Sequence, residues 1–341
     1  MTGIDLFAVQ PHMTLDDYRD ADAFSTHMLR LVDGIANRLH EHALVVFPED
    51  LATFLALGAA PAGLDGVATL DEAFAQLGRK LAARLLWSRA RYRTGSLEAA
   101  FLLTAAPRVY RAWYTTFSAV ARATGATVVA GSALIPENRL GYGSAEYAPQ
   151  DGRVYNLSLA FGPDGRVVDH TAKVNLVPTQ EDVLHLTPST APRTVYRAGP
   201  ATVGTAICYD AFLVPHSNRE PGFRSQVTPL ADLGATIIAQ PSANPWRWEE
   251  PWSRSGLPGR ADGRLRREQW REEGLAAAMR ADPRIVAGVN PQLLTSLWDV
   301  HFDGRSAILV RQGDRVDTVA QAPRADCHPD SEAVIHWSLT L

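Results

Sequence analysis

Hydrophobic positions along the chain follow two different spacings, which alternate in the manner of an α/β protein. Continuous apolar runs of strand length occupy 4–11, 43–50, 126–135, 201–210, 235–243, 284–290 and 306–316. Apolar residues three or four positions apart predict helices, at 15–41, 70–90, 108–124, 224–233 and 267–281. Strands that alternate with helices build layered sheets, so we expect an α/β domain.

Residues 154–173 predict one further pair of strands, joined by the turn-forming sequence GPDG at 162–165. A hairpin pairs its strands antiparallel, so we expect a mixed sheet. Neither a short repeat nor a low-complexity linker divides the chain. We therefore expect a single domain over 1–341, with an enlarged helical region at 51–125 and a C-terminal extension at 317–341.

Composition and charge agree with an ordinary globular protein of 341 residues, 46% hydrophobic and 21% charged, with a formal net charge of −4. This mild acidity gives no reason to expect a nucleic acid or an anionic membrane as partner. No apolar run approaches the roughly 18 residues of a membrane span, and residues 1–22 lack the pattern of a signal peptide. Two cysteines form no disulfide framework or zinc motif. We expect a soluble, cytoplasmic protein without a metal.

Three of the predicted strands end in a reactive side chain, namely Glu49, Lys173 and Cys208. Side chains at strand ends of layered α/β folds converge on a crevice. There Lys173 would favour the thiolate of Cys208, and Glu49 could take the thiol proton and return it to a leaving group. Lys173 could also face the charge that develops on an attacked carbonyl oxygen. Taken singly, each residue is better explained as capping, solvated or packed, so the prediction depends on their occurring together.

Three segments carry a resemblance to a known family: FPED at 47–50, KVNLVPTQE at 173–181 and GTAICYD at 204–210. In this order they resemble the signature segments of the nitrilase superfamily of carbon–nitrogen hydrolases, and the resemblance covers about 4–315. It implies a four-layer α-β-β-α sandwich with two mixed β-sheets. It also implies a homodimer or a higher homo-oligomer that needs no cofactor.

The same resemblance implies roles for individual residues. Glu49, Lys173 and Cys208 match the Glu–Lys–Cys triad, and Glu181 matches a second, supporting glutamate, with Asp182 the less favoured choice. The backbone N–H of Tyr209 matches the oxyanion donor that acts beside the lysine. The implied reaction is attack of the cysteine on an amide carbonyl, release of ammonia or an amine, and hydrolysis of the thioester by water.

The residues after the cysteine bear on the substrate. Tyr209-Asp210 resembles the amidase and carbamoylase branch rather than true nitrilases, and Asp210 itself is expected to cap the next turn. Carbamoylases of D-amino acids commonly have arginines here, but residues 211–218 are largely apolar and Arg219 comes only later. Asn175 stands where many members have histidine. We therefore predict a small amide or carbamoyl substrate; a nitrilase, an acyltransferase and a non-catalytic binding or assembly protein are the alternatives.

Two aromatic regions remain open. The segment 242–252 holds three tryptophans, and within it Asn244 and Trp246 are candidate substrate-binding residues. It could instead form a lid or a subunit interface, since interfaces are enriched in Trp and Arg. Within 51–115, aromatic side chains could wall an apolar pocket, although packing of an inserted helical pair is favoured. These are Trp87, Trp113 and Tyr114.

Overall fold

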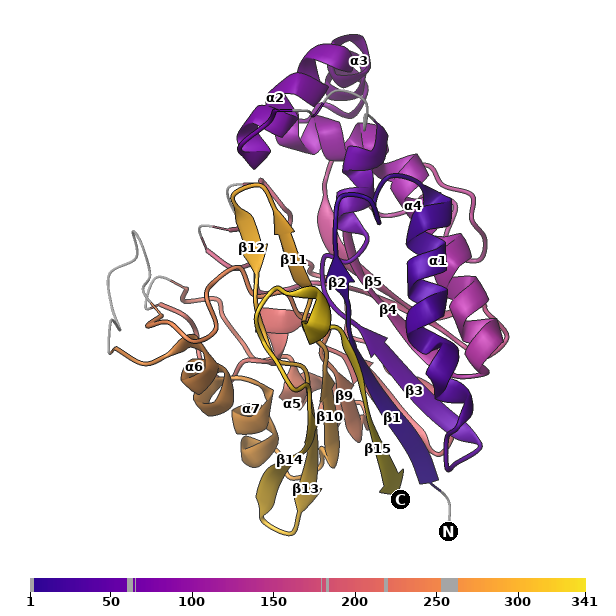
Figure 1. Cartoon of the computed structure of the whole chain (residues 1–341), viewed down its shortest axis with the longest axis vertical. Coiled ribbons are helices and arrows are strands. Elements are labelled where there is room, and N and C mark those ends of the chain that lie inside the picture. Colours follow the sequence, from indigo (N-terminus) through magenta and orange to yellow (C-terminus); the bar gives the residue numbers. More distant parts are fainter. Residues whose placement is uncertain are drawn as a thin grey trace.

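The computed structural model describes residues 3–59, 64, 66–178, 180–181, 184–217, 220–252 and 263–341 (Figure 1). Two six-stranded sheets dominate it. The first has the order β15-β1-β3-β4-β5-β6, with β1 Gly3–Gln10, β3 His42–Phe47, β4 Thr127–Ile135, β5 Tyr155–Phe161, β6 Val167–Ala172 and β15 Ala333–Thr340. The second has the order β14-β13-β10-β9-β8-β7, with β7 Tyr196–Ala198, β8 Ala201–Thr205, β9 Ile237–Ala239, β10 Ala287–Asn290, β13 Ala307–Gln312 and β14 Arg315–Gln321.

Both sheets are mixed, as the sequence predicts. In the first sheet β1, β3 and β4 run parallel to one another, whereas β5 pairs antiparallel with both β4 and β6. The β5–β6 hairpin turns at the predicted GPDG sequence, where Gly165 has φ 76° and donates its N–H to the Gly162 carbonyl at 2.8 Å. A small third sheet joins β2 His12–Met13, β11 Leu294–Leu297 and β12 Val300–Phe302.

The side chains of β1 explain why its sequence is apolar throughout. Ile4, Leu6 and Ala8 point into a core shared by strands of both sheets, whereas Phe7 and Val9 pack into a separate core with the helices. A strand that is covered on both faces has no solvent-exposed side, so its sequence does not alternate between apolar and polar residues. The two six-stranded sheets therefore pack face to face at the centre of the molecule.

Helices cover the outer face of each sheet and complete a four-layer α-β-β-α sandwich. α1 Ala21–Val32 and α4 Leu97–Thr124 lie against the first sheet, and α5 Val227–Asp232 and α7 Leu275–Ala281 against the second. Figure 1 shows α1 and α4 on one side of the strands and α7, with α6 Arg266–Glu273, on the other. In the described part of the chain, no helix is long and apolar enough to cross a membrane.

Several predicted helices have different limits in the structure. The helix predicted at 15–41 is shorter, because Asp20 caps α1 by accepting the Ala23 N–H at 2.8 Å and residues 33–36 tighten into a 3₁₀ turn. The helix predicted at 267–281 divides at Gly274 into α6 and α7.

The segment 51–125 holds a helical hairpin and one long helix. The helix predicted at 70–90 is two helices, α2 Leu70–Lys80 and α3 Ala82–Tyr92. α4 begins at Leu97, well before the predicted start at 108, because Ser96 caps it and the helix continues through Pro107. Gly125, with φ 62°, ends α4.

The C-terminal residues form an integral part of the first sheet. β15 pairs antiparallel with β1 along its whole length, from Gly3 opposite Thr340 to Gln10 opposite Ala333. His27 of α1 ties the start of this strand to the helix layer, since its Nε2 lies 2.7 Å from Oε2 of Glu332. The segment 317–341 thus supplies an edge strand.

Candidate active site

Cys208 stands on a sharp turn that follows β8. The strand predicted at 201–210 ends at Thr205, and Cys208 is the first residue of a 3₁₀ turn, Cys208–Ala211. Its backbone has φ 45°, a conformation uncommon for a residue with a side chain. Two hydrogen bonds hold it there: the Cys208 N–H donates to the Pro241 carbonyl at 2.8 Å, and Gln240 Nε2 donates to the Cys208 carbonyl at 2.8 Å. The thiol-bearing residue is only 4% exposed.

Glu49 is placed by the turn after β3 and by a glycine of the neighbouring strand. Gly131 in β4 has φ 65°, and a Cβ at this position would clash with the carbonyl oxygen of Pro48. The glycine therefore lets β4 pass close beneath the turn. Ser132 Oγ accepts the Asp50 N–H at 2.9 Å and fixes the turn from the same strand. Glu49 is buried, and its Oε2 accepts the Ala243 N–H at 3.0 Å.

Lys173 follows β6 directly and lies between two carboxylates. Its Nζ donates to Oε1 of Glu49 at 2.7 Å and to Oε2 of Glu181 at 2.6 Å. Glu181 Oε2 also accepts the Val177 N–H at 2.8 Å, which fixes this carboxylate in the loop after the lysine. The structure thus brings together three of the predicted site residues, and both ion pairs are buried.

Burial outweighs the effect of Lys173 on the Cys208 thiol. Burial and the Glu49 carboxylate raise the pKa of this thiol well above its ordinary value. Lys173 acts in the expected direction, since its charge lowers the thiol pKa, but it offsets the rise only in part. The resting thiol is neutral.

Burial and charge also shift the two partners of the thiol. Burial raises the pKa of Glu49, and Glu181 adds to this, while Lys173 opposes it. Burial alone would lower the pKa of Lys173, but Glu181 and Glu49 outweigh it and raise the pKa well above the ordinary value. Lys173 is therefore a permanent cation, whereas Glu49 is a carboxylate with enhanced affinity for a proton.

Asp210 does not cap the turn that follows it, contrary to the prediction. Its carboxylate accepts the backbone N–H groups of Val174, at 3.1 Å, and Asn175, at 2.7 Å. Asn175 Nδ2 donates to the same carboxylate at 3.0 Å. Asp210 therefore fastens the segment after Lys173 to the turn that carries Cys208, and burial raises its pKa to about 6.

The side chain of Tyr209 stabilises the cysteine turn from behind. Its hydroxyl donates to Oε2 of Glu220 at 2.6 Å and accepts the His216 N–H, and its ring stacks on the His216 ring at 4.0 Å. These contacts hold the residue whose backbone N–H is expected to face an oxyanion. That role of the Tyr209 N–H stays a prediction.

Comparison with known proteins decides the family. A carbon–nitrogen hydrolase family model matches residues 8–253. The chain belongs to this family. No curated protein gives a significant sequence match.

Solved structures place this carbon–nitrogen hydrolase in the nitrilase superfamily fold. It is similar to the amidase from Nesterenkonia sp. AN1, with 16% identity and a TM-score of 0.54 over 100% of this chain and 93% of that chain. Saccharomyces cerevisiae Nit3, from branch 10 of the nitrilase superfamily, has 18% identity and a TM-score of 0.54 over 99% and 90%. A carbon–nitrogen hydrolase from Helicobacter pylori G27 has 13% identity and a TM-score of 0.58 over 99% and 88%. The predicted four-layer fold is confirmed.

Aromatic side chains surround the cysteine of this carbon–nitrogen hydrolase. Cys208 belongs to a buried cluster with Phe212, Trp248 and Trp270, and Trp246 packs against this cluster half-buried. The guanidinium of Arg266 lies over the rings of Trp246 and Trp270, 4.5 Å and 5.6 Å from their centroids. The tryptophan-rich segment therefore contributes to the wall beside the thiol.

Asn244 is committed to contacts within the protein. It is fully buried, its Nδ2 donates to the carbonyls of Trp246 at 2.7 Å and Asp303 at 2.8 Å, and its Oδ1 accepts from Arg266 Nε at 2.7 Å. These bonds give Asn244 a part in shaping the wall. Substrate binding by Asn244 or Trp246 stays a prediction.

The remaining residues named in the sequence analysis, as far as the structure describes them, do not line the site around Cys208. Trp113 and Tyr114 are buried in the core between α4 and the first sheet, and Trp113 Nε1 donates to the Ala130 carbonyl at 2.7 Å. Trp87 lies exposed on α3. Asp182 and Arg219 lie outside the described residues. Among the described residues, no group of three His, Cys, Asp or Glu side chains could hold a metal ion.

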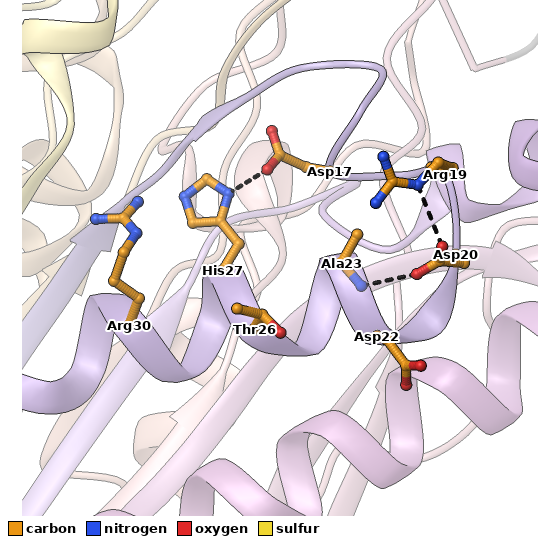
Figure 2. Close-up of a pocket in the computed structure, with 8 residues that line it drawn as sticks. All are labelled: Asp17, Arg19, Asp20, Asp22, Ala23, Thr26, His27 and Arg30. Atoms are coloured by element: carbon orange, nitrogen blue, oxygen red, sulfur yellow. Dashed lines mark hydrogen bonds and ion pairs between the residues drawn. The ribbon is translucent and has the colours of Figure 1, made fainter.

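A cavity of about 510 Å³ at the start of α1 has a different chemistry (Figure 2). None of the predicted site residues lines it. Its centre is His27, whose Nδ1 lies 2.7 Å from Oδ1 of Asp17. Burial would lower the pKa of His27, but Asp17 and Glu332 outweigh it and raise the pKa to about 9. This cluster joins α1 to the segment that enters β15.

Sequence reasoning missed Asn156, which contacts both carboxylates of the site. Its Nδ2 donates to Oε1 of Glu49 at 2.8 Å and to Oε1 of Glu181 at 2.9 Å. The available signal was a single amide side chain in the otherwise apolar start of β5, in the hairpin that ends in Lys173. A buried polar side chain needs a partner, so an isolated one marks a polar neighbour.

Proposed function

We propose that this carbon–nitrogen hydrolase uses Cys208 to cleave a non-peptide C–N bond of a linear amide or an N-carbamoyl compound through a thioester. The observation that supports this most is the convergence of Glu49 and Lys173, 2.7 Å apart, beside the buried thiol of Cys208. Three groups with matched uses, delivered by three different strands, are what acyl transfer to a thiol needs.

The first half of the proposed reaction begins from the neutral thiol. Sγ of Cys208 attacks the carbonyl carbon while the Glu49 carboxylate takes the thiol proton, which suits a base whose pKa is raised by burial. The C–N bond then breaks, Glu49 returns the proton to the leaving nitrogen, and ammonia or an amine departs. Cys208 is left as a thioester.

Lys173 is placed to stabilise the oxyanion of this step. An ammonium group has three N–H donors, and two of those of Lys173 serve Glu49 and Glu181. The third is left for the carbonyl oxygen, together with the backbone N–H of Tyr209. A preorganised donor of this kind typically contributes about 3 kcal/mol to transition-state stabilisation.

Water completes the cycle in the second half. Glu49, again a carboxylate, takes a proton from a water molecule whose oxygen attacks the thioester carbon. The C–S bond breaks, the proton returns to sulfur, and the carboxylic acid or carbamic acid leaves. Every proposed step uses side-chain and backbone groups of the chain, the substrate and water.

Small amides are the first substrates to test. A glutamate-to-glutamine mutant of the amidase from Nesterenkonia sp. AN1, which has the same fold, has been seen with acrylamide added to its active-site cysteine and with the acetamide moiety of fluoroacetamide bound covalently there. Tyr209-Asp210 after the cysteine also favours the amidase and carbamoylase branch.

The test is a screen of amides, carbamoylated amines and nitriles, read by ammonia release. We expect the wild type and Cys327→Ala to release ammonia from an amide or carbamoyl compound, and Cys208→Ala to release none. The Cys327 variant is a matched control because it removes the other thiol of the chain. Retained turnover in Cys208→Ala contradicts the proposal, and ammonia from nitriles alone would replace amides by nitriles as the substrate class.

A further inference from the structure

Asn156 closes a ring of hydrogen bonds around the candidate site. Its Nδ2 lies 2.8 Å from Glu49 and 2.9 Å from Glu181, while Lys173 Nζ contacts the same two carboxylates from its own side. Asn156 is 1% exposed. The opposite orientation of its amide would place the acceptor Oδ1 against both carboxylates, which are themselves acceptors. The donor Nδ2 must therefore be the atom that faces them.

The hairpin of β5 and β6 places Asn156 and Lys173 side by side. The Lys173 N–H donates to the Asn156 carbonyl at 2.9 Å, so the two residues pair across the antiparallel strands. A buried carboxylate is costly unless each oxygen is hydrogen-bonded. Two carboxylates also repel each other, and each N–H between them offsets part of that repulsion.

We propose that Asn156 is a positioning residue that keeps Glu49 ionised and aimed at Cys208. The proposal rests on the proposed function, because it gives Glu49 the part of general base. Loss of the amide donor leaves both carboxylates with one hydrogen bond fewer in a buried site. Glu49 then holds its own proton more tightly and is a base only at higher pH.

The test follows the alkylation of Cys208 by iodoacetamide against pH, in a Cys327→Ser background so that one thiol reacts. In a plot of alkylation rate against pH, the acid limb is the range in which the rate rises with pH. We expect Asn156→Leu to move this acid limb upwards by about one pH unit and to slow alkylation about tenfold at neutral pH. Ser158→Ala is the matched control, because Ser158 is a buried polar residue of the same strand without a hydrogen-bond partner in the described structure. It should leave the profile unchanged.

Asn156→Asp is a second variant of nearly the same shape, for the case in which the leucine variant does not fold. It brings a third carboxylate into the ring, and we expect the acid limb to move upwards again. An acid limb that stays in place in a folded Asn156 variant overturns the proposal. This readout needs no substrate, so it separates the role of Asn156 from the proposed function, which fails if Cys208→Ala keeps turnover.

An independent feature is the outward side of α3. Between Glu72 and Glu98 the sequence has six basic residues and no acidic one. Leu86 is 64% and Trp87 62% exposed, whereas Leu85 and Ser88 of the same helix are buried. We call the outward side the α3 face, and it consists of the exposed residues Ala83, Arg84, Leu86, Trp87, Arg89, Ala90 and Arg91.

The α3 face has an apolar centre with cations along both margins. At 100° per residue, Leu86 and Trp87 lie together in the middle, Arg84 and Arg91 on one margin and Arg89 on the other. Within the described residues these arginines contact no carboxylate, although Arg89 Nη2 donates to the Gly95 carbonyl at 3.1 Å and the Arg91 guanidinium lies 5.4 Å from the centroid of the Tyr92 ring. Figure 1 shows α2 and α3 extending beyond the sandwich at one end of the molecule. Arg84 and Trp87 also border a hollow that Leu103 and Pro107 of α4 line from the other side.

We infer that the α3 face binds an anionic phospholipid surface. Cations attract the headgroups, and Trp and Leu side chains enter the boundary between headgroups and acyl chains. A second copy that met the same face would bring like charges together, which argues against a symmetric dimer here. The chain-wide charge of −4, which gave no reason to expect such a partner, hides this local excess.

Co-sedimentation with vesicles tests the inference, using phosphatidylcholine alone and phosphatidylcholine mixed with phosphatidylglycerol. We expect binding only to the mixed vesicles and at least about a tenfold loss of binding in high salt. The double variants Leu86→Ser with Trp87→Ser and Arg84→Gln with Arg91→Gln should each lose it. Leu233→Ser is the control, since Leu233 is exposed on the far helix layer.

Three results overturn the inference. They are no binding to the anionic vesicles, binding that survives both double variants, and a change of oligomeric state in the variants measured by light scattering. The last would assign the α3 face to contact between copies of the chain.

Discussion

Lys173 Nζ lies 2.7 Å from Oε1 of Glu49, although 124 positions separate the two residues in the sequence. The contact joins the end of β6 to the turn after β3, and Glu181 closes it at 2.6 Å from the other side. One buried cation therefore serves two buried carboxylates. Its removal would leave a doubly negative pocket. Its effect on the Cys208 thiol is outweighed by burial and by the Glu49 carboxylate, which raise the pKa of that thiol.

Lys173→Met keeps the length of the side chain and removes its charge. We expect the free energy of unfolding to fall by about 3–5 kcal/mol, because breaking a buried pair leaves uncompensated charge behind. Urea denaturation measures this. Arg139→Met, at an exposed arginine, should change stability by less than about 0.5 kcal/mol. A Lys173→Met protein as stable as the wild type would contradict the charge arrangement.

Gly131→Ala tests how the turn of Glu49 is held. A methyl group at 131 meets the Pro48 carbonyl oxygen and also forces a side chain into φ 65°. We expect a loss of more than about 2 kcal/mol in stability and of ammonia release. Gly141→Ala has a similar φ of 77° but open space around it, so it should cost only about 1 kcal/mol and leave activity intact. Equal costs at the two positions would show that the contact with Pro48 does not matter.

The reactivity of Cys208 should depend on Glu49 rather than on a preformed thiolate. Because burial raises its pKa, the thiol needs a base beside it to react near neutral pH. We expect iodoacetamide to modify Cys208 faster than Cys327, and Glu49→Gln to slow Cys208 about a hundredfold. Cys327 is the internal control, since its pKa is raised to about 11 away from Glu49. Mass spectrometry of the two peptides gives both rates, and an unchanged Cys208 rate in Glu49→Gln would refute this dependence.

His27 should make stability depend on alkaline pH. Its pKa is raised from 6.5 to about 9 in the folded protein, so the folded state holds the proton more tightly than the unfolded chain. The resulting stabilisation, up to about 3 kcal/mol, is complete below pH 6.5 and is lost as the pH rises through about 9. Urea denaturation between these values should show the decline in the wild type. His27→Gln should flatten it, and a wild type without the decline would contradict the shift.

The sequence was enough to predict the layered fold and the meeting of Glu49, Lys173 and Cys208, because strand ends converge and the three motifs stand in order. It could not predict the sign of the thiol's pKa shift. That sign depends on how deeply the thiol is buried and on how close the Glu49 carboxylate lies to it, and spacing along the chain gives neither.

Local details escaped prediction for similar reasons. The strand to Cys208 ends at Thr205 although Ala206 and Cys208 still donate to the carbonyls of Ala239 and Pro241, because Pro241 has no N–H to return a ladder bond. Asn156 was missed because a single amide in an apolar run carries no spacing signal. α4 starts at the Ser96 cap and continues through Pro107, because burial of its apolar side chains against the first sheet offsets the cost of an internal proline.

The most direct measurement is a rapid quench of the protein with an accepted amide, followed by mass spectrometry of its peptides. Covalent attack predicts an acyl group on the peptide that contains Cys208, formed at least as fast as turnover and absent from the Cys327 peptide. Turnover that proceeds without any acyl adduct on Cys208, or with the adduct on another residue, would contradict it.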